Sequence, residues 1–330
     1  MPPPPDLSSY ILPIDTAKEI FNTEILPAEF TSLQPSPLTD SQPPLAVLIV
    51  GQTGAGKTRH APPILSALTS VRRAPPAHFI ADTYKTYHPS YQKLASGPSP
   101  AHASPATGPD ARRWLLMAAH HAASLRLDVL LESACRHPDD FAQLAAAFHA
   151  AAYRVEVVVL AVPRALSRLG ILTRFYERLP EAGSRGLPVR LTPTKVHDDS
   201  YEGLLQAAQW IDRNGEKVGQ VLVVRRGNLV AFSDERAGDG EVLGGLVAEA
   251  ITRERERPLT EVEARIARDD LSRLEAVDAD KAAEVRDMID SLLPSAPEGV
   301  EYPPLRPLEF PPDSTNRQAM LMLGTSAPNL

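Results

Sequence analysis

The sequence is poor in cysteine, in aromatic residues and in positive charge. Cys135 is the single cysteine among 330 residues, so no disulfide can form within the chain, and a reducing compartment is expected. The net charge is −7, which provides no general attraction for nucleic acid or anionic lipid. The first residues lack a signal-peptide pattern, and no apolar run is long enough to span a bilayer. We therefore expect a cytoplasmic protein with no nucleic-acid partner and no membrane partner.

A phosphate-binding loop is the strongest single feature of the chain. It follows the apolar run 45–50, which is typical of a buried parallel strand. The loop consists of Gly51, Gln52, Thr53, Gly54, Ala55, Gly56, Lys57 and Thr58. This order matches G-x-x-x-x-G-K-S/T, in which small residues let backbone N–H groups approach a polyanion. Lys57 can reach the β- and γ-phosphates of a bound nucleotide, and the Thr58 hydroxyl can ligate Mg²⁺.

Apolar strands alternate with helical patterns from residue 45 to about 213. Strands are predicted at 45–50, 78–81, 129–131 and 154–162. Helices are predicted at about 57–70, 110–125, 139–152, 163–179 and 194–213. The alternation predicts an α/β fold, a P-loop NTPase-like parallel sheet with helices on both faces. We expect a kink or an early break at Pro62 and Pro63, and Asp110 is the expected N-cap of the second helix.

Composition divides the chain into three parts. Residues 1–44 form a proline-rich segment with one helix, at 15–29, that is expected to dock on the main domain. Residues 45–213 form the P-loop domain. Residues 214–330 are predicted to hold a β-hairpin, charged helices at about 241–255 and 260–292, and a proline-rich tail. Composition does not choose among a lid, a regulatory arm and a partner-binding module for these helices.

Carboxylates follow two of the predicted strands, as Asp82 and Glu132. Ligands of an open parallel sheet bind beyond the carboxyl ends of its strands. Asp82 can therefore hold Mg²⁺ or deprotonate an attacking hydroxyl, although an aspartate there can also cap a turn. Glu132 allows the same roles. Phosphoryl transfer also calls for positive charge, for which Arg174 and Arg190 are candidates, although a helical arginine is more often a surface ion-pair partner.

Other chemistries find less support in the sequence. No Asn-Lys-x-Asp segment for guanine recognition is present, which disfavours a GTPase. His60, His120 and His121 have no metal-ligand spacing with cysteines, so no zinc site is predicted. His197 and Asp198 are weak candidates for site residues, because acidic residues in the first turns of a helix interact favourably with the helix dipole and need no functional explanation.

Five segments in this order resemble the zeta-toxin family, the P-loop kinases of bacterial toxin–antitoxin systems. After the P-loop, residues 82–89 contain Asp-Thr-Tyr-Lys and His-Pro, similar to the family's Asp-Thr-Phe-Lys and His-Pro. Residues 131–136, Leu-Glu-Ser-Ala-Cys-Arg, are similar to Ile-Glu-Gly-Thr-Gly-Arg. Residues 161–174 contain Ala-Val-Pro, Leu-Gly and Arg, and residues 190–198 contain Arg-Leu-Thr-Pro and His-Asp. The similarity covers about residues 15–213 and leaves the C-terminal third unexplained.

The resemblance implies a kinase that phosphorylates the 3′-hydroxyl of the amino sugar in UDP-N-acetylglucosamine with ATP. Lys57 and Thr58 would hold ATP and Mg²⁺. Asp82 would be the base, and Arg174 and Arg190 would stabilise the transferred phosphoryl group.

The acceptor side departs from the family pattern. By resemblance, Thr83, Glu132 and Arg136 bind the sugar nucleotide. The family's Gly-Thr-Gly is replaced at residues 133–135, and the position of its sugar-contacting glutamate is Leu116. Because leucine cannot accept a hydrogen bond from a sugar, a different acceptor is an open alternative.

The resemblance also implies a control mechanism. Family members are often inhibited by a small helical antitoxin that blocks the nucleotide site, and here the helices after Glu241 could inhibit in cis instead. Besides a kinase of UDP-N-acetylglucosamine, two alternatives stay open: a kinase of a different nucleotide or sugar, and an ATP-binding regulatory module with little turnover.

Overall fold

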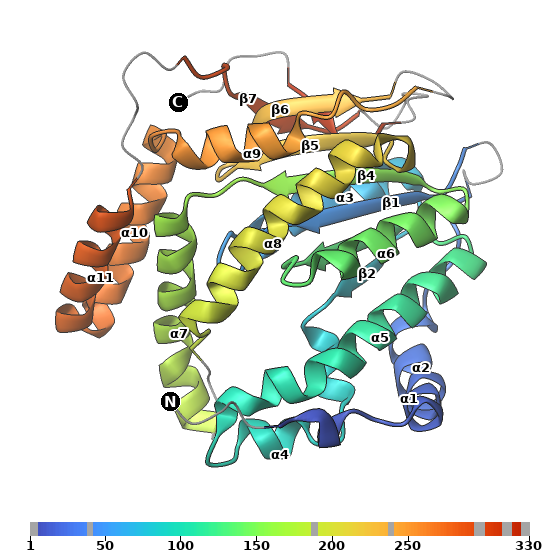
Figure 1. Cartoon of the computed structure of the whole chain (residues 1–330), viewed down its shortest axis with the longest axis horizontal. Helices are drawn as coiled ribbons and strands as arrows, with labels where there is room; N and C mark the ends of the chain where they lie inside the picture. The colour runs from blue at the N-terminus through green and yellow to red at the C-terminus, as the bar shows by residue number, and fades with distance from the viewer. Residues whose placement is uncertain are drawn as a thin grey trace.

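A mixed eight-stranded sheet forms the centre of the molecule (Figure 1). The computed structural model describes residues 6–37, 42–185, 191–236, 241–293, 301–311 and 319–324. The strands, in sheet order, are β2 (Ala77–Ile80), β3 (Val129–Ser133), β1 (Leu45–Val50), β4 (Arg154–Leu160), β5 (Gln220–Arg225), β6 (Leu229–Glu235), β7 (Arg306–Glu309) and β8 (Met322–Leu323). The first five are parallel and the last three antiparallel. The predicted α/β fold and the C-terminal hairpin are confirmed, and the hairpin extends the parallel sheet.

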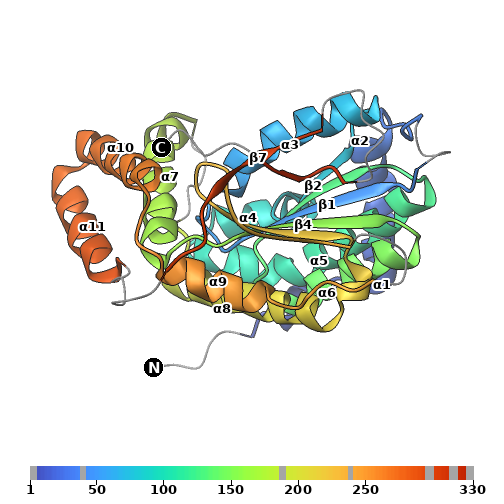
Figure 2. The same ribbon diagram turned by 90° about the horizontal axis from the view of Figure 1, so that it is seen from above.

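Helices cover both faces of this sheet. They are α1 (Ile14–Ile20), α2 (Leu26–Phe30), α3 (Lys57–Arg72), α4 (Tyr91–Ala95), α5 (Ala103–Ser124), α6 (Pro138–Ala150), α7 (Arg164–Arg185), α8 (Thr194–Arg213), α9 (Val247–Glu256), α10 (Glu261–Val277) and α11 (Ala279–Leu292). Figure 2 shows α3 on one face and α6, α8 and α9 on the other. None of the helices in the described ranges is long and apolar enough to cross a bilayer.

The central strand β1 explains why two cores form. Every residue of β1 is buried, and successive side chains point to opposite faces of the sheet. Leu48 and Val50 pack in one apolar cluster with α5, α6 and α8, whereas Val47 and Ile49 pack in the other with α3, α10 and α11. The unbroken apolar run in the sequence is therefore the signature of a strand that is buried on both sides.

The early break expected at Pro62 and Pro63 does not occur. Helix α3 continues to Arg72 with both prolines inside it. A proline within a helix costs about 3 kcal/mol, so the two together cost about 6 kcal/mol. Beyond the prolines, Ile64 and Leu68 are fully buried against the sheet, and burying two such side chains contributes about 3 to 6 kcal/mol. Tertiary packing thus offsets the local penalty.

Asp110 is not an N-cap, so that prediction is wrong. Helix α5 begins at Ala103, and Asp110 lies buried within it. Its carboxylate accepts a hydrogen bond from the Leu12 N–H at 3.0 Å and pairs with Arg113 at 2.9 Å. The carboxylate thereby ties the N-terminal segment to α5, a role that depends on a contact between residues distant in the chain.

The N-terminal helix packs against α5. It spans Ile14 to Phe30, with a π-helical turn between α1 and α2. Ile20, Phe21 and Ile25 are buried in the same apolar cluster as α5, and the indole of Trp114 donates a hydrogen bond to the carbonyl of Ala17 at 2.8 Å.

The single helix expected at 260–292 is two helices, α10 and α11, which meet at Asp278. Thr260 caps α10 in a capping box with Glu263. Leu274 of α10 and Ile289 of α11 belong to the same apolar cluster as Ile49 of β1 and the buried side chains of α3. These helices therefore complete one core of the P-loop sheet.

Candidate active site

A cavity of about 300 Å³ opens at the carboxyl ends of the parallel strands. The P-loop between β1 and α3 lines it, and so do Asp82 after β2 and Glu132 near the end of β3. Helix α7 contributes Arg174, and the turn after β5 contributes Arg226. Three predicted site residues outside the P-loop thus line the same cavity as Lys57.

The P-loop has the backbone geometry of a phosphate cradle. Gly54 and Gly56 adopt φ angles of 82° and 97°, which glycine tolerates without strain. Helix α3 begins directly after them at Lys57, so its first N–H groups and its dipole face the loop. The Lys57 ammonium donates to the carbonyl oxygen of Gly51 at 2.7 Å. Burial lowers the pKa of Lys57, while the charge of Asp82 acts in the opposite direction.

Asp82 lies at the mouth of the cavity. Its side chain is 79% exposed and forms an ion pair with Lys85. The protein atoms around the carboxyl group displace part of its hydration even at this exposure and so oppose ionisation, but the charges of Lys85 and Lys57 hold the pKa of Asp82 below its ordinary value. Asp82 is therefore a carboxylate at neutral pH and can accept a proton or a hydrogen bond. Its neighbour Thr83 is not among the residues that line the cavity, and its hydroxyl donates to the carbonyl of Ile80 at 2.8 Å.

Glu132 is placed deeper in the site. Its register beside Ile49 of β1 brings it next to the P-loop. The side chain is only 3% exposed, and its Oε1 lies 2.9 Å from Nε2 of His78 on β2. A buried carboxylate needs such a partner, which His78 provides on one side while the cavity opens on the other.

The three predicted arginines have different positions. Arg174 lines the cavity, and its charge lowers the pKa of both Lys57 and Asp82. Arg136 does not line the cavity, and it pairs with Asp199 of α8 at 3.3 Å. Arg190 lies outside the described residues.

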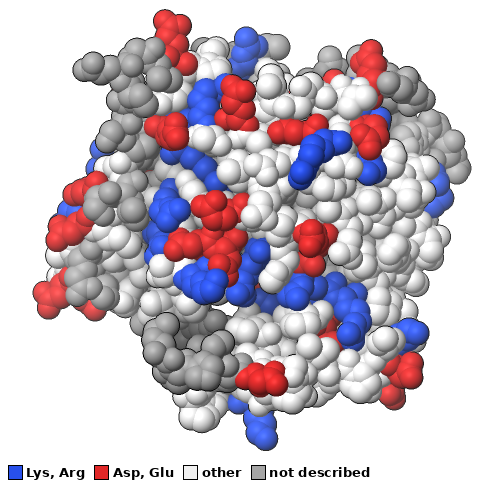
Figure 3. Space-filling view, viewed as in Figure 1, with Lys and Arg blue, Asp and Glu red and all other residues white. Residues whose placement is uncertain are grey.

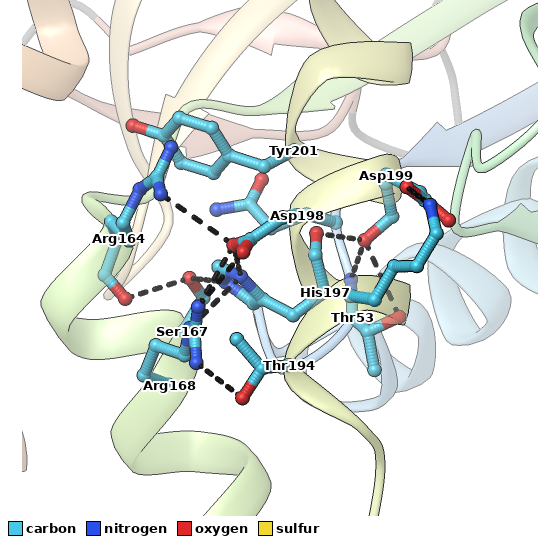
Figure 4. A network of polar contacts seen from close by, with 12 residues as sticks. Thr53, Arg164, Ser167, Arg168, Thr194, His197, Asp198, Asp199 and Tyr201 are labelled. Carbon is cyan, nitrogen blue, oxygen red and sulfur yellow. Dashed lines mark hydrogen bonds and ion pairs between the residues drawn. The ribbon is translucent and has the colours of Figure 1, made fainter. Parts of the chain in front are cut away.

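A polar network joins α7, α8 and the P-loop (Figure 4). The buried His197 has Nε2 at 2.7 Å from Ser167 Oγ and Nδ1 at 2.9 Å from Asp198 Oδ1. Burial lowers the pKa of His197, so the ring is neutral at physiological pH. Serine, histidine and aspartate match a hydrolase triad in residue type, but Ser167 is fully buried and donates to the carbonyl of Arg164 at 3.1 Å. The set is therefore structural.

The same network reaches the P-loop through α8. Ser200 Oγ accepts a hydrogen bond from the Thr53 N–H at 3.1 Å. In addition, the guanidinium of Arg255 stacks on Tyr201 at 3.5 Å and approaches Gln52 Oε1 at 3.5 Å. Figure 3 shows the face of the molecule seen in Figure 1, with acidic and basic side chains gathered in its middle, where α7 and α8 lie. The contacts of Ser200 and Arg255 therefore hold the P-loop in position from α8 and α9. The sequence did not reveal this role, because acidic residues at the start of a helix already have a structural explanation.

Sequence reasoning missed Arg226. Its Nη2 donates to the carbonyl oxygens of Gly54 at 2.9 Å and Leu166 at 2.7 Å. Burial lowers its pKa to about 10, so it remains charged at neutral pH. The one local signal in the sequence is the pair Arg225 and Arg226, which follows an apolar strand at the turn of the predicted hairpin.

Comparisons with known proteins identify the family and the fold. The family model of the zeta toxin matches residues 29–237, which is more than half of the chain. Among curated proteins, none matches this sequence. The solved structure of the PezAT chromosomal toxin–antitoxin system of Streptococcus pneumoniae has a TM-score of 0.62 at 17% identity, covering 81% of this chain and 98% of that chain. This similarity shows a shared fold.

Two structures of the AvrRxo1-ORF1:AvrRxo1-ORF2 complex are more distant. The native complex has a TM-score of 0.48 at 14% identity, covering 86% of this chain and 85% of that chain. The complex with ATP has a TM-score of 0.46 at 15% identity, covering 85% of this chain and 84% of that chain.

Proposed function

Since this chain belongs to the zeta-toxin family, we propose that it is an ATP- and Mg²⁺-dependent kinase that phosphorylates a hydroxyl group of a small molecule. One observation carries the proposal. Lys57, Asp82 and Arg174 come from separate parts of the chain and line one cavity at the carboxyl edge of the sheet. A cation in the P-loop, a carboxylate at the mouth of the cavity and a guanidinium in the same lining are the groups that phosphoryl transfer needs.

Each group has its own role in the proposed reaction. The P-loop N–H groups and Lys57 bind the triphosphate, with Lys57 exchanging the carbonyl of Gly51 for phosphate oxygens. Asp82 accepts the proton of the attacking hydroxyl as the new oxygen–phosphorus bond forms and the bond to the ADP oxygen breaks. Arg174 offsets the negative charge on the transferred group.

Thr58 is the residue that would ligate Mg²⁺. It lines the cavity at the start of α3. Within the described residues, no three His, Cys, Asp or Glu side chains are grouped to hold a metal. That pattern fits Mg²⁺, which takes few protein ligands and completes its shell with phosphate oxygens and water. The ion would supply neutralising charge at the phosphates.

UDP-N-acetylglucosamine is the leading acceptor because of the family, and a different nucleotide or sugar is the second candidate. The second candidate rests on a specific observation. Leu116, at the family's sugar-contacting position, packs against the apolar core, and Cys135 is buried with a positive φ of 49°. Neither position thus offers the carboxylate that would accept a hydrogen bond from a sugar hydroxyl.

ATP consumption with and without UDP-N-acetylglucosamine tests the proposal. We expect acceptor-dependent turnover that falls by about 10²- to 10⁴-fold in Asp82→Asn, the size of a general-base contribution. Asp139→Asn, which removes an exposed carboxylate on α6, is the control and should leave turnover unchanged. Mass spectrometry of extracts from expressing cells then identifies the metabolite that gains a phosphate. ATP binding without turnover under any acceptor would show a regulatory module instead.

A protein antitoxin is the proposed partner. The PezAT structure comes from a toxin–antitoxin system, and this supports the same arrangement here. Growth arrest on expression, relieved by a co-expressed neighbouring open reading frame, would support it; normal growth at full expression of active enzyme contradicts it.

A further inference from the structure

The order of the strands sets the direction in which a nucleotide must lie. Asp82 follows β2 and Glu132 lies near the end of β3, and both strands are on one side of β1, whereas β4 and β5 lie on the other side. A triphosphate on the P-loop with its γ-phosphate toward Asp82 therefore directs its ribose and base toward β5. The residue that lines the cavity at the end of β5 is Arg226.

Arg226 is held so that one nitrogen is left for a ligand. Its side chain is only 5% exposed, and Nη2 is fixed on the two carbonyls of Gly54 and Leu166. Nη1 is buried and has no hydrogen-bond partner among the residues that the structure describes. A buried unsatisfied donor costs about 1–3 kcal/mol, so an acceptor atom on a bound molecule would remove that cost.

Helix α10 supplies the opposite charge. Asp270 lines the cavity with a side chain that is 2% exposed, and its Oδ2 lies 3.7 Å from Nη1 of Arg226. Its Oδ1 lies 3.4 Å from Nη2 of Arg59 on α3. Both views place α10 beside α7 (Figures 1 and 2), and α10 lies beyond the residues 29–237 that match the family.

We propose that Arg226 and Asp270 form the binding site for the ribose and base of the nucleotide, with Arg226 Nη1 as the donor and Asp270 as its positioning residue. This inference rests on the proposed function. Helix α10 then forms part of the nucleotide-binding site, which argues against an inhibitory role for this helix.

Comparing two ligands distinguishes binding of the ribose and base from binding of the triphosphate. Titration calorimetry with Mg·ATP and with Mg·tripolyphosphate is carried out on the full chain, on Asp270→Asn and on Arg226→Lys. We expect ATP affinity to fall by about tenfold to a hundredfold in both variants, as for one hydrogen bond to a charged group. Because tripolyphosphate has neither ribose nor base, its affinity should stay within about twofold in Asp270→Asn. In Arg226→Lys, which also loses the hydrogen bond to Gly54 of the P-loop, tripolyphosphate affinity should fall by less than ATP affinity. Asp269→Asn removes the exposed neighbouring carboxylate on α10 and should change neither affinity.

The ratio of the two affinities is internal to each variant, so a general loss of folding cannot imitate the expected result. Unchanged ATP affinity, or an equal loss for both ligands, overturns the inference. The proposed kinase activity is judged separately, by the dependence of turnover on Asp82. A kinase that loses activity in Asp82→Asn but binds ATP normally in Asp270→Asn and Arg226→Lys retains the proposed function and refutes this inference alone.

Discussion

Gly170 on α7 offers a test of how closely this helix must approach the P-loop. A Cβ at Gly170 would lie 2.6 Å from the carbonyl oxygen of Gly54 and 2.8 Å from Nη2 of Arg226. An ordinary contact begins at 3.4 Å, so Gly170→Ala requires a displacement of about 0.8 Å (3.4 − 2.6) between α7 and the loop. The nearest obstacle is backbone, which cannot rotate away as a side chain does.

The two energetic consequences have opposite signs. Alanine raises helix propensity by about 1 kcal/mol relative to glycine. Forcing a methyl group into a close-packed interface costs about 1–3 kcal/mol. We expect the second effect to prevail and the free energy of unfolding to fall by up to about 2 kcal/mol. A displacement of about 1 Å at a catalytic group can cost about 10²-fold in rate. We therefore also expect kcat/KM for ATP to decrease by up to about 10²-fold.

Urea unfolding and steady-state turnover measure the two effects in parallel. Gly244→Ala is the control, since its added methyl would meet only the carboxylate of Asp234 at 3.4 Å. It should change stability by less than about 0.5 kcal/mol, as surface substitutions usually do. A Gly170→Ala protein as stable and as active as the wild type would show that α7 does not press on the P-loop, and the reasoning would fail.

Two further predictions concern stability. Arg225→Met should lower the free energy of unfolding by about 3–5 kcal/mol, because Arg225 pairs with Glu263 at 2.6 Å and Glu254 at 3.5 Å and all three side chains are 0% exposed. Urea unfolding of this variant and of Arg225→Met/Glu254→Gln/Glu263→Gln, which should regain part of the loss, checks this; a loss below about 1 kcal/mol contradicts it. Burial lowers the pKa of His60 to about 4, so below pH 6.5 the unfolded chain binds a proton that the folded chain does not. Stability should therefore decrease from pH 6.5 to pH 4 by up to about 1.4 kcal/mol per pH unit, and urea unfolding of His60→Gln should show a shallower decrease; equal slopes would exclude His60 as the cause.

The phosphate-binding loop and the order of strands and helices could be predicted from the sequence because their causes are local. A contiguous pattern places Gly51 to Thr58 after a strand wherever the rest of the chain lies. The carboxylates Asp82 and Glu132 could be predicted as well, since the carboxyl ends of parallel strands meet at one edge. The roles assigned to these residues in catalysis stay predictions.

Only the tertiary structure decided which distant residues complete the site. Arg226 contacts Gly54 across 172 positions of the chain, and no local pattern carries such a pairing. The same holds for the burial of Asp110 and for the continuation of α3 through Pro62, because the stabilising partners come from other elements. Local propensity determines where helices and strands can form, whereas burial and charge pairing between distant segments determine which of them enclose the nucleotide.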